Sequence, residues 1–591
     1  MIVVLCRALA LALMGLALFA QPPVMPLNEI RPGMRGIGKT VFTGDRVDQF
    51  DVEVLGVLEN VGPRQSLVLA RLSGGPLQHT GVLQGMSGSP VYIGGRLVGA
   101  VAMSFPYAKD PIAAIRPFEE MRRKRFTGRD AQRAGISLWE TDLTKNMARS
   151  TDVPAGESRL MDIATPVSFA GFTRGTIEHF GAQLKSLGFE PRQGVAGGGK
   201  PARRLGNPAK LEPGSMISVQ LLTGDMSVGA DGTVTAVEGK HVYAFGHRFL
   251  SIGDTQLPFA RAEVLTLLPN LSSSFKISTA REWMGTITAD YNTAVAGELG
   301  RRASMIPVSI EVQRKSSNGK PISSAGYHIE MVNDRYLSPF LLQMAVYSAI
   351  DATERTVGVS SFLLRGQVEF ENAAPLKLDN AYAGEFNVPA QVSLGAAMPV
   401  AYALQSGFDA LTLKNVSITV EAFSQNKQLQ VAGAWASREA VRPGESVDLT
   451  VLLAGENGLE LSRTVSYQVP VGAVPGPLFF TAADGNTTNL TEYRNVIGEQ
   501  PKSPSRVLSF LNGLRGNNKA YVRVWRASPG YQIEGEDLPN PPASVSMVLG
   551  RGPANQAGWA VPRNAKVAEM SIDTGDMIVT GSKTVQVEIK E

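Results

Sequence analysis

The stretch "QGMSGSPVYIGGRLVGAV" at residues 84–101 is the most informative part of the chain for its fold. It places Ser87 between Gly85 and Gly88, follows with a proline, and continues as two short apolar runs joined by a Gly-Gly pair. Glycines allow a sharp backbone turn, and β-branched runs around Gly-Gly are typical of a hairpin. We expect a tight serine-bearing turn that leads into strand, hairpin and strand. Such a turn serves either a nucleophilic serine or a purely structural connection.

Length and composition indicate a multidomain, β-rich protein. The chain has 591 residues, 43% of them apolar, with 61 glycines and 36 prolines. This length predicts about three to five domains. A formal net charge of +4 gives no sign of nucleic-acid binding, and the short basic run at 121–129 reads as a solvated helix end or loop.

The N-terminus indicates export from a bacterial cell. Residues 2–19 are almost entirely apolar and residues 20–21 resemble a cleavage site, which predicts a signal peptide at 1–20; an uncleaved membrane anchor stays open. Cys6 is the only cysteine. The cleaved chain would therefore have no disulfide, no thiolate metal site and no cysteine nucleophile. We expect a periplasmic or outer-envelope location.

Strand patterns dominate the chain, and three segments have helical periodicity. The expected helices cover residues 116–126, 174–188 and 338–355, and a Gly/Pro-rich stretch at 193–214 reads as a linker or surface loop. Beyond about residue 366 the pattern of strands and Pro-Gly or Gly-Asn turns becomes typical of an immunoglobulin-like sandwich.

The segment "GMRGIGKT" at residues 33–40 matches the phosphate-loop pattern letter for letter. That chemistry requires a buried strand before the loop and a helix after it, because the helix N-terminus holds the phosphates. Arg31 and Pro32 precede the segment, and a β-branched, aromatic run with an early turn follows it. We therefore expect a turn that enters a strand, and no nucleotide site.

A nucleophilic Ser87 needs N–H groups for the oxyanion and a nearby base. The turn presents the N–H groups of Gly85 and Ser87 for the first purpose. Of the five histidines, His247 in "YAFGHRFLSIGDTQLPF" follows a buried-looking strand and a glycine, where a base can face a cleft. The others read as solvent-exposed, helical or strand residues: His79, His179, His241 and His328.

The chain resembles a known family in two regions. "VLQGMSGSPVYIGGRLVGAV" with "DPIAAI" at 110–115 is similar to the serine region of SpoIVB-type peptidases, and "GTVTAVEGKHVYAFGHRFLSIGDTQLPFA" with the segment 278–300 is similar to their histidine region. The two regions stand in swapped order, as if the halves were circularly permuted. The resemblance implies Ser87 as nucleophile, His247 as general base and a chymotrypsin-like double β-barrel.

With this resemblance, the expected fold is mainly β, with the double barrel followed by one or two immunoglobulin-like modules. The expected segments are the signal peptide at 1–20, the serine-bearing half at 26–160, a helix and linker at 161–212, the histidine-bearing half at 213–365, an immunoglobulin-like sandwich at 366–474 and a β-rich module at 475–591.

The family's catalytic aspartate has no counterpart here. It should lie about fifteen residues before the serine, but the chain has no carboxylate between Glu59 and Ser87. Asp254 and Asp110 are weak substitutes, and a Ser-His dyad or a degenerate site are the alternatives. Loss of the orienting acid costs on the order of 10⁴ in turnover in well-studied triads.

The sequence thus predicts an exported serine endopeptidase that acts on envelope proteins or on itself, with no metal or cofactor. The competing hypothesis is a catalytically degenerate, protease-like protein that binds or scaffolds envelope partners. The missing aspartate favours the second hypothesis, and the intact serine and histidine segments favour the first.

Overall fold

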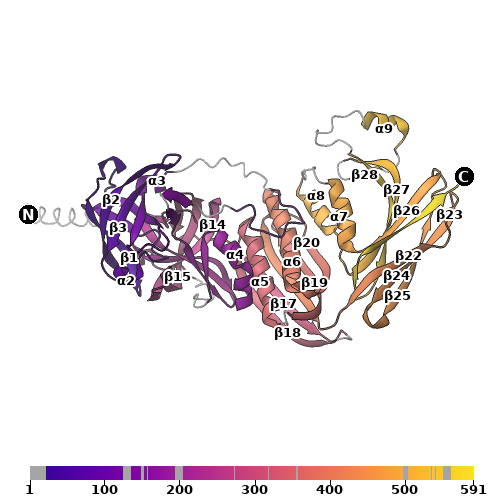
Figure 1. Cartoon of the computed structure of the whole chain (residues 1–591), viewed down its shortest axis with the longest axis horizontal. Coiled ribbons are helices and arrows are strands. Elements are labelled where there is room, and N and C mark those ends of the chain that lie inside the picture. The colour runs from indigo at the N-terminus through magenta and orange to yellow at the C-terminus, as the bar shows by residue number, and fades with distance from the viewer. Residues whose placement is uncertain are drawn as a thin grey trace, which may run out of the picture. The chain divides into compact units, whose positions relative to one another are not determined.

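The computed structural model describes residues 22–123, 135–147, 152–155, 158–193, 204–271, 273–316, 319–353, 357–496, 503–533, 536–538, 541–549 and 561–591. The chain forms two compact units: unit 1 comprises residues 1–132, 142–306 and 328–341, and unit 2 comprises residues 133–141, 307–327 and 342–591 (Figure 1). The expected signal peptide at 1–20 and residues 194–203 of the expected linker lie outside the described residues. Among the described helices, none has both the length and the apolar character needed to cross a membrane.

Six strands of unit 1 close into a first antiparallel barrel. They pair in the order β4-β1-β2-β3-β6-β5, and β4 also pairs with β5, which completes the ring. Phe50, Val52 and Val54 alternate with more exposed residues along β2 and contribute to the core, as expected for a strand with one buried face. The elements are β1 (Arg35–Thr43), β2 (Arg46–Gly62), β3 (Gln65–Ser73), α2 (Leu77–Thr80), β4 (Pro90–Ile93), β5 (Arg96–Ser104), β6 (Ile112–Pro117) and α3 (Phe118–Met121), with β7 (Asp152–Ala155) and β8 (Ser158–Asp162) extending the sheet beyond β5.

A second six-stranded antiparallel barrel follows in the same unit. Its strands pair in the order β12-β13-β16-β15-β14-β11, and β11 also pairs with β12. Strand β12 is buried along almost its whole length, and Thr233 and Thr235 on it donate to carbonyls of the serine turn of the first barrel. The barrel strands are β11 (Met216–Gly224), β12 (Ser227–Glu238), β13 (His241–Ala244), β14 (Gly253–Leu268), β15 (Phe275–Tyr291) and β16 (Ala294–Leu299). The flanking elements are β9 (Thr165–Ala170), α4 (Arg174–Ser186), β10 (Phe189–Gln193) and β18 (Pro321–Val332).

The prediction of a mainly β protein with a double barrel and a following sandwich is confirmed. The swapped order of the two halves relative to the family stays a prediction. Two predicted helices are present as α4 and α5 (Leu337–Thr353), and Thr173 caps α4 by accepting a hydrogen bond from the N–H of Thr176. The helix predicted at 116–126 is shorter, because in the described residues it forms only α3.

The first part of unit 2 contains a layer of strands with a helix on it (Figure 1). Strand β17 (Met305–Lys315) pairs in parallel with β21 (Leu413–Phe423), and β19 (Val357–Phe370) pairs antiparallel with both β21 and β20 (Leu376–Phe386). Helix α6 (Val388–Gln405) packs on β19 and β20. The sequence analysis missed this helix because apolar and small residues occur on all its sides, so no amphipathic period appears.

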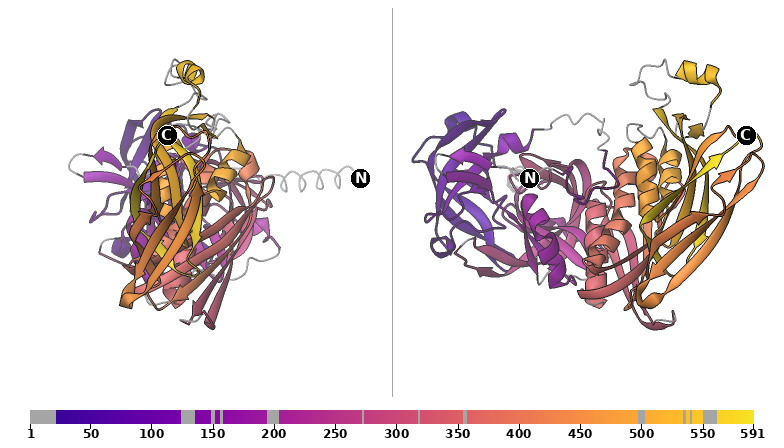
Figure 2. Two further views of the ribbon diagram at one scale, coloured as in Figure 1. Left: turned by 90° about the vertical axis from the view of Figure 1, so that its right-hand side faces the viewer. Right: turned by 45° about the vertical axis from the view of Figure 1, so that its right-hand side comes forward.

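The predicted boundaries of the C-terminal modules are wrong. The described strands between residues 428 and 591 form one sandwich of two sheets, not two successive modules, and residues 366–423 belong to the preceding layer (Figure 2). The reason is long-range pairing: β22 pairs with β30, and β23 pairs with β31, so the ends of this segment share sheets. The strands are β22 (Gln428–Ala436), β23 (Ala440–Val441), β24 (Ser446–Gly455), β25 (Glu460–Gln468), β26 (Gly476–Ala483), β27 (Lys519–Ile533), β28 (Glu536–Leu538), β29 (Val561–Asp573), β30 (Ile578–Thr580) and β31 (Ser582–Ile589). The helices of this region are α7 (Gly485–Val496), α8 (Pro504–Asn512) and α9 (Ala543–Leu549).

Candidate active site

The serine turn lies directly before β4, and the predicted strand, Gly-Gly hairpin and strand follow it. Gly85 and Gly88 have φ angles of 90° and 94°, in the left-handed region that glycine adopts without strain. Ser87 is 0% exposed, and its Oγ has no hydrogen-bond partner in the described part of the chain. Most buried hydroxyls are hydrogen-bonded, but the nearby Ser89 Oγ is also buried without a partner in the described ranges.

His247 lies in a strained turn after β13. Phe245 and Gly246 precede it with φ angles of 68° and 69°, and for the bulky Phe245 this conformation costs about 1–3 kcal/mol. The Nδ1 atom lies 2.6 Å from the carbonyl oxygen of Arg248. Because a carbonyl only accepts, Nδ1 carries the proton and the neutral ring has its lone pair on Nε2. Nε2 is also buried without a partner among the described residues.

Thr233 of β12 joins the serine turn to the histidine turn. Its N–H donates to the carbonyl of Ser87 at 2.8 Å, and its carbonyl accepts from the N–H of Phe245 at 3.2 Å. Its Oγ1 donates to the carbonyl of Gly85 at 2.8 Å. A Cβ at Gly88 would lie 2.5 Å from the nitrogen of Phe245, so only glycine fits there. The two barrels therefore meet at this point, which the sequence implied only through the family resemblance.

The N–H groups of Gly85 and Ser87 are the two that the sequence suggested for an oxyanion hole. Within the described ranges neither donates a hydrogen bond to another protein group, whereas the N–H groups of Met86, Gly88 and Ser89 all donate to carbonyls. Two N–H donors of the serine turn are thus left without a protein acceptor among the described residues, and an oxyanion site needs such donors.

The charges around His247 come from three other residues. Burial is the main cause that lowers its pKa, the carboxylate of Asp162 opposes this, and Arg116 and Arg248 add to the lowering. A lowered pKa keeps the imidazole neutral near pH 7, which is the form that accepts a proton. Asp162 ends β8 and pairs with Met103 of β5. The sequence analysis did not identify Asp162, because only the pairing of β8 with β5 brings it to this region.

The two acids suggested by the sequence have different neighbours. Asp254 is exposed on β14. Burial of the Tyr291 phenol is the main cause that raises its pKa, and the charge of Asp254 raises it further. The Asp110 side chain is 64% exposed and lies 3.9 Å from Arg71. Neither is among the groups that chiefly shift the pKa of His247.

Residues 18–111 match the family model described as SpoIVB peptidase S55. This part of the chain is similar to SpoIVB-type peptidases. The match includes Ser87 and ends before His247, so it covers the serine half alone. Comparisons with curated proteins and with solved structures gave no match.

A buried carboxylate holds the loop that follows the histidine. Asp290 is 1% exposed and accepts hydrogen bonds from the N–H groups of Phe249 at 2.8 Å, Leu250 at 2.6 Å and Ile252 at 3.2 Å. Burial raises the pKa of Asp290 to about 6, although these N–H groups oppose the shift. Asp290 therefore fixes the backbone beside His247 without contacting the ring.

A second buried polar cluster supports the serine turn of the segment that matches the family model. The Nζ of Lys276 donates to the Oγ1 of Thr40 at 2.7 Å, and Asp231 accepts a hydrogen bond from Ser278. Burial lowers the pKa of Lys276 to about 7 and raises that of Asp231 to about 6. A Cβ at Gly85 would lie 3.4 Å from the Lys276 Cδ, so the lysine stem packs under the turn.

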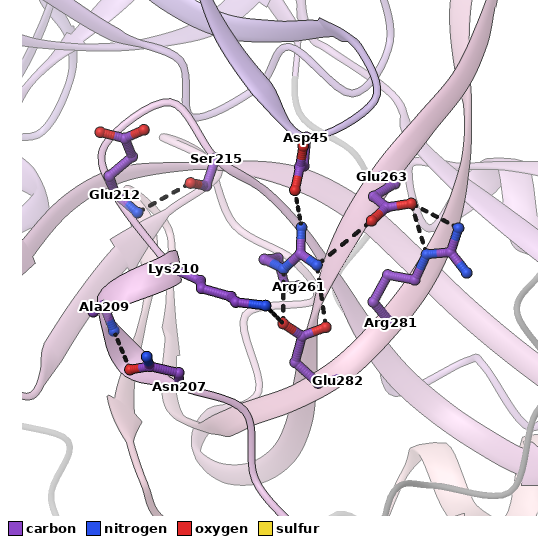
Figure 3. Close-up of polar contacts among 10 residues, drawn as sticks. All are labelled: Asp45, Asn207, Ala209, Lys210, Glu212, Ser215, Arg261, Glu263, Arg281 and Glu282. Carbon is purple, nitrogen blue, oxygen red and sulfur yellow. Dashed lines mark hydrogen bonds and ion pairs between the residues drawn. The ribbon is translucent and has the colours of Figure 1, made fainter.

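An ion cluster links the β1–β2 hairpin of this segment to the second barrel (Figure 3). Arg261 lies 2.9 Å from Asp45 of the hairpin, 3.0 Å from Glu282 and 3.5 Å from Glu263. Beside it, the N–H and the carbonyl of Gly44 both bond to Val264 at 2.8 Å. The Arg261 side chain is only 9% exposed, and three carboxylates compensate its charge.

The phosphate-loop pattern of the segment forms no phosphate loop. Residues from Arg35 onward belong to β1, where Lys39 pairs with Gln49 of β2 and lies 5.5 Å above the ring of Tyr92. The backbone is an extended, paired strand, so it offers no helix N-terminus to phosphates. Among the described residues, no group of three or more His, Cys, Asp or Glu side chains is placed to hold a metal ion.

Proposed function

We propose that the chain is an exported serine endopeptidase with Ser87 as nucleophile and His247 as general base. The observation that carries the proposal is the pair of buried, unpartnered atoms Ser87 Oγ and His247 Nε2 on two turns that hydrogen-bond to the same residue, Thr233. Burying two unpaired polar atoms costs free energy. Among the described residues Ser87 Oγ and His247 Nε2 are not hydrogen-bonded to each other, so the proposed proton transfer requires a local rearrangement that brings the two atoms together.

The reaction follows from the proposed roles. Nε2 of His247 takes the proton from Ser87 as Oγ bonds to the peptide carbonyl carbon, and the carbonyl oxygen becomes an oxyanion. The N–H groups of Gly85 and Ser87 stabilise it. His247 then gives the proton to the leaving amine as the C–N bond breaks. In the second half of the reaction a water molecule attacks the acyl carbon while Nε2 of His247 takes its proton. His247 then returns the proton to Ser87 Oγ as the bond between Oγ and the acyl carbon breaks.

The carbonyl of Arg248 takes the orienting role that an aspartate has in a triad. It accepts the Nδ1 proton of His247 at 2.6 Å, which fixes the tautomer and aims Nε2 away from the backbone. The carboxylate of Asp162 then stabilises the imidazolium, since its charge raises the pKa of His247. This division of roles is our proposed substitute for the missing aspartate.

The proposed centre is closed. Ser87 and His247 are 0% and 3% exposed, and Phe245, Phe249 and Phe189 pack edge to face or tilted around the histidine turn. Peptide access therefore requires a local opening of this region. We infer that the substrate is a segment of an envelope protein, or of this chain, that is extended enough to enter.

The test is covalent labelling of the full chain with a fluorophosphonate, a reagent that reacts with activated serines. We expect labelling of the wild type and its loss in Ser87→Ala and in His247→Ala. Ser89→Ala is the matched control, because Ser89 is equally buried and its Oγ also has no partner among the described residues. It should label like the wild type. An unlabelled wild type would overturn the proposal and favour the scaffolding hypothesis.

A further inference from the structure

Arg192 of β10 has a poorly compensated guanidinium beside the proposed centre. Its NH2 lies 3.4 Å from the Oε1 of Gln84 and 3.7 Å from the carboxylate of Glu190. Its Nε is buried without a partner among the described residues. The guanidinium lies over the ring of Phe275, 3.9 Å from its centroid, which fixes its plane.

Two other buried arginines of this protein, Arg261 and Arg515, are paired far better. Arg261 has three carboxylates within 3.5 Å, and Arg515 makes two-pronged hydrogen bonds to Glu492 and to Glu569. Such pairing is the usual condition for burying a guanidinium. Arg192 lacks such pairing, although its side chain is only 29% exposed. Arg335 and Arg523 also have one buried nitrogen without a partner among the described residues, but of these three Arg192 alone hydrogen-bonds to Gln84 of the serine turn. A negative group supplied from outside the chain would complete the pairing of Arg192.

Arg192 is connected to the serine turn through the side chain of Gln84. Gln84, its hydrogen-bond partner, directly precedes Gly85, whose N–H is a proposed oxyanion donor. The backbone of Gln84 is held by the carbonyl of Ser274 at 2.9 Å and by the N–H of Lys276 at 3.2 Å. Through Gln84, Arg192 lies beside the segment that carries the proposed oxyanion donors.

The charges near the catalytic pair also favour an anion. Arg248 and Arg116 both lower the pKa of His247, and Asp162 raises it. Arg116 is paired with Glu120 at 3.4 Å, whereas the NH2 of Arg248 is buried without a partner in the described ranges. A cation such as Arg248 that is not fully compensated attracts a negatively charged ligand and steers its approach.

We propose that Arg192 binds a carboxylate of the peptide held at the Ser87–His247 centre, so that the substrate class is an acidic peptide. This inference rests on the proposed peptidase function. The carboxylate comes from a Glu or Asp side chain near the scissile bond or from the C-terminus of the peptide. Both sources present the same two oxygens to the guanidinium.

The experiment compares three pools of N-acetylated random peptides. The first pool contains Glu and an amidated C-terminus, the second has Gln in place of Glu, and the third has Gln with a free C-terminal carboxylate. Each pool competes with fluorophosphonate labelling of the wild type, and each is also tested for binding to Ser87→Ala by fluorescence polarisation. We expect at least one carboxylate pool to bind about tenfold or more tightly than the amidated Gln pool, as one charge-assisted hydrogen bond provides.

Variants of Arg192 test whether its guanidinium causes the preference for peptides with a carboxylate. Arg192→Gln should abolish the preference, and Arg192→Lys should retain part of it, since the charge remains. Arg174→Gln is the control, because Arg174 is 82% exposed on α4, and it should keep the full preference. Equal competition by all pools in a labelled wild type would overturn the inference and leave the peptidase proposal intact. A wild type that is unlabelled but binds carboxylate pools through Arg192 would overturn the peptidase proposal instead.

Discussion

The hydroxyl of Thr233 donates a hydrogen bond to the carbonyl oxygen of Gly85, 2.8 Å away, and both residues are buried. Thr233 belongs to the second barrel and Gly85 to the first. The contact holds the peptide plane next to the N–H of Gly85, which is one of the two proposed oxyanion donors. The geometry of the serine turn thus depends on a strand more than a hundred residues away.

Thr233→Val removes this bond and leaves the Gly85 carbonyl unsatisfied. An unpaired buried acceptor costs about 1–3 kcal/mol, and a misplaced oxyanion donor should slow fluorophosphonate labelling by about tenfold or more. Thr286→Val is the control: Thr286 is equally buried and donates to the carbonyl of Arg301 at 2.9 Å. It should lose similar stability in urea denaturation but label at the wild-type rate. Equal labelling rates in both variants would contradict the prediction.

Gly88→Ala should disrupt the junction of the two barrels. The added Cβ would lie 1.9 Å from the carbonyl oxygen of Thr233, at a φ of 94°, so backbone must move. Gly95 also has a positive φ, of 76°, but open space around it, so Gly95→Ala adds conformational strain alone, about 1–3 kcal/mol. We expect Gly88→Ala to lower the urea midpoint clearly more than Gly95→Ala. The reverse order would show that the serine turn packs differently.

The pH profile of labelling tests whether Asp162 or Asp254 shifts the pKa of His247. Burial lowers the pKa of His247 below its ordinary value of 6.5, so the wild-type rate should fall on acidification with a midpoint below that value. Asp162→Asn removes a charge that raises this pKa, and the midpoint should move to a still lower pH. Asp254→Asn should leave the midpoint unchanged. A shift in Asp254→Asn with none in Asp162→Asn would reverse the assignment.

Lys276 should make stability depend on pH in the alkaline range. Its pKa is lowered by burial to about 7, whereas lysine in an unfolded chain titrates near about 10.4. Between these values the unfolded chain binds more protons, so the folded protein gains stability as the pH rises. Relative to Lys276→Met, the wild type should gain up to about 1.4 kcal/mol per pH unit across this window. Urea denaturation at several pH values measures the difference, and a constant difference would contradict the prediction.

Local patterns predicted the local structure well. The serine turn, the Gly-Gly hairpin and the helices at 174–188 and 338–355 depend on residues close in sequence, and all are present. Helix α6 was missed because its buried surface extends around most of its circumference, so periodicity could not reveal it. The sandwich boundaries were wrong because β22 and β23 take partners from the last strands of the chain.

The sequence by itself determined the chemistry available to this protein: a serine turn with two glycines, a histidine after a buried strand, and no carboxylate before the serine. Only the tertiary structure decided which groups surround that chemistry. Thr233 ties the two turns together, Asp162 reaches His247 through the pairing of β8 with β5, and Arg192 reaches the serine turn from β10. These contacts arise from barrel closure and sheet pairing between distant segments, and spacing along the chain carries no signal for them.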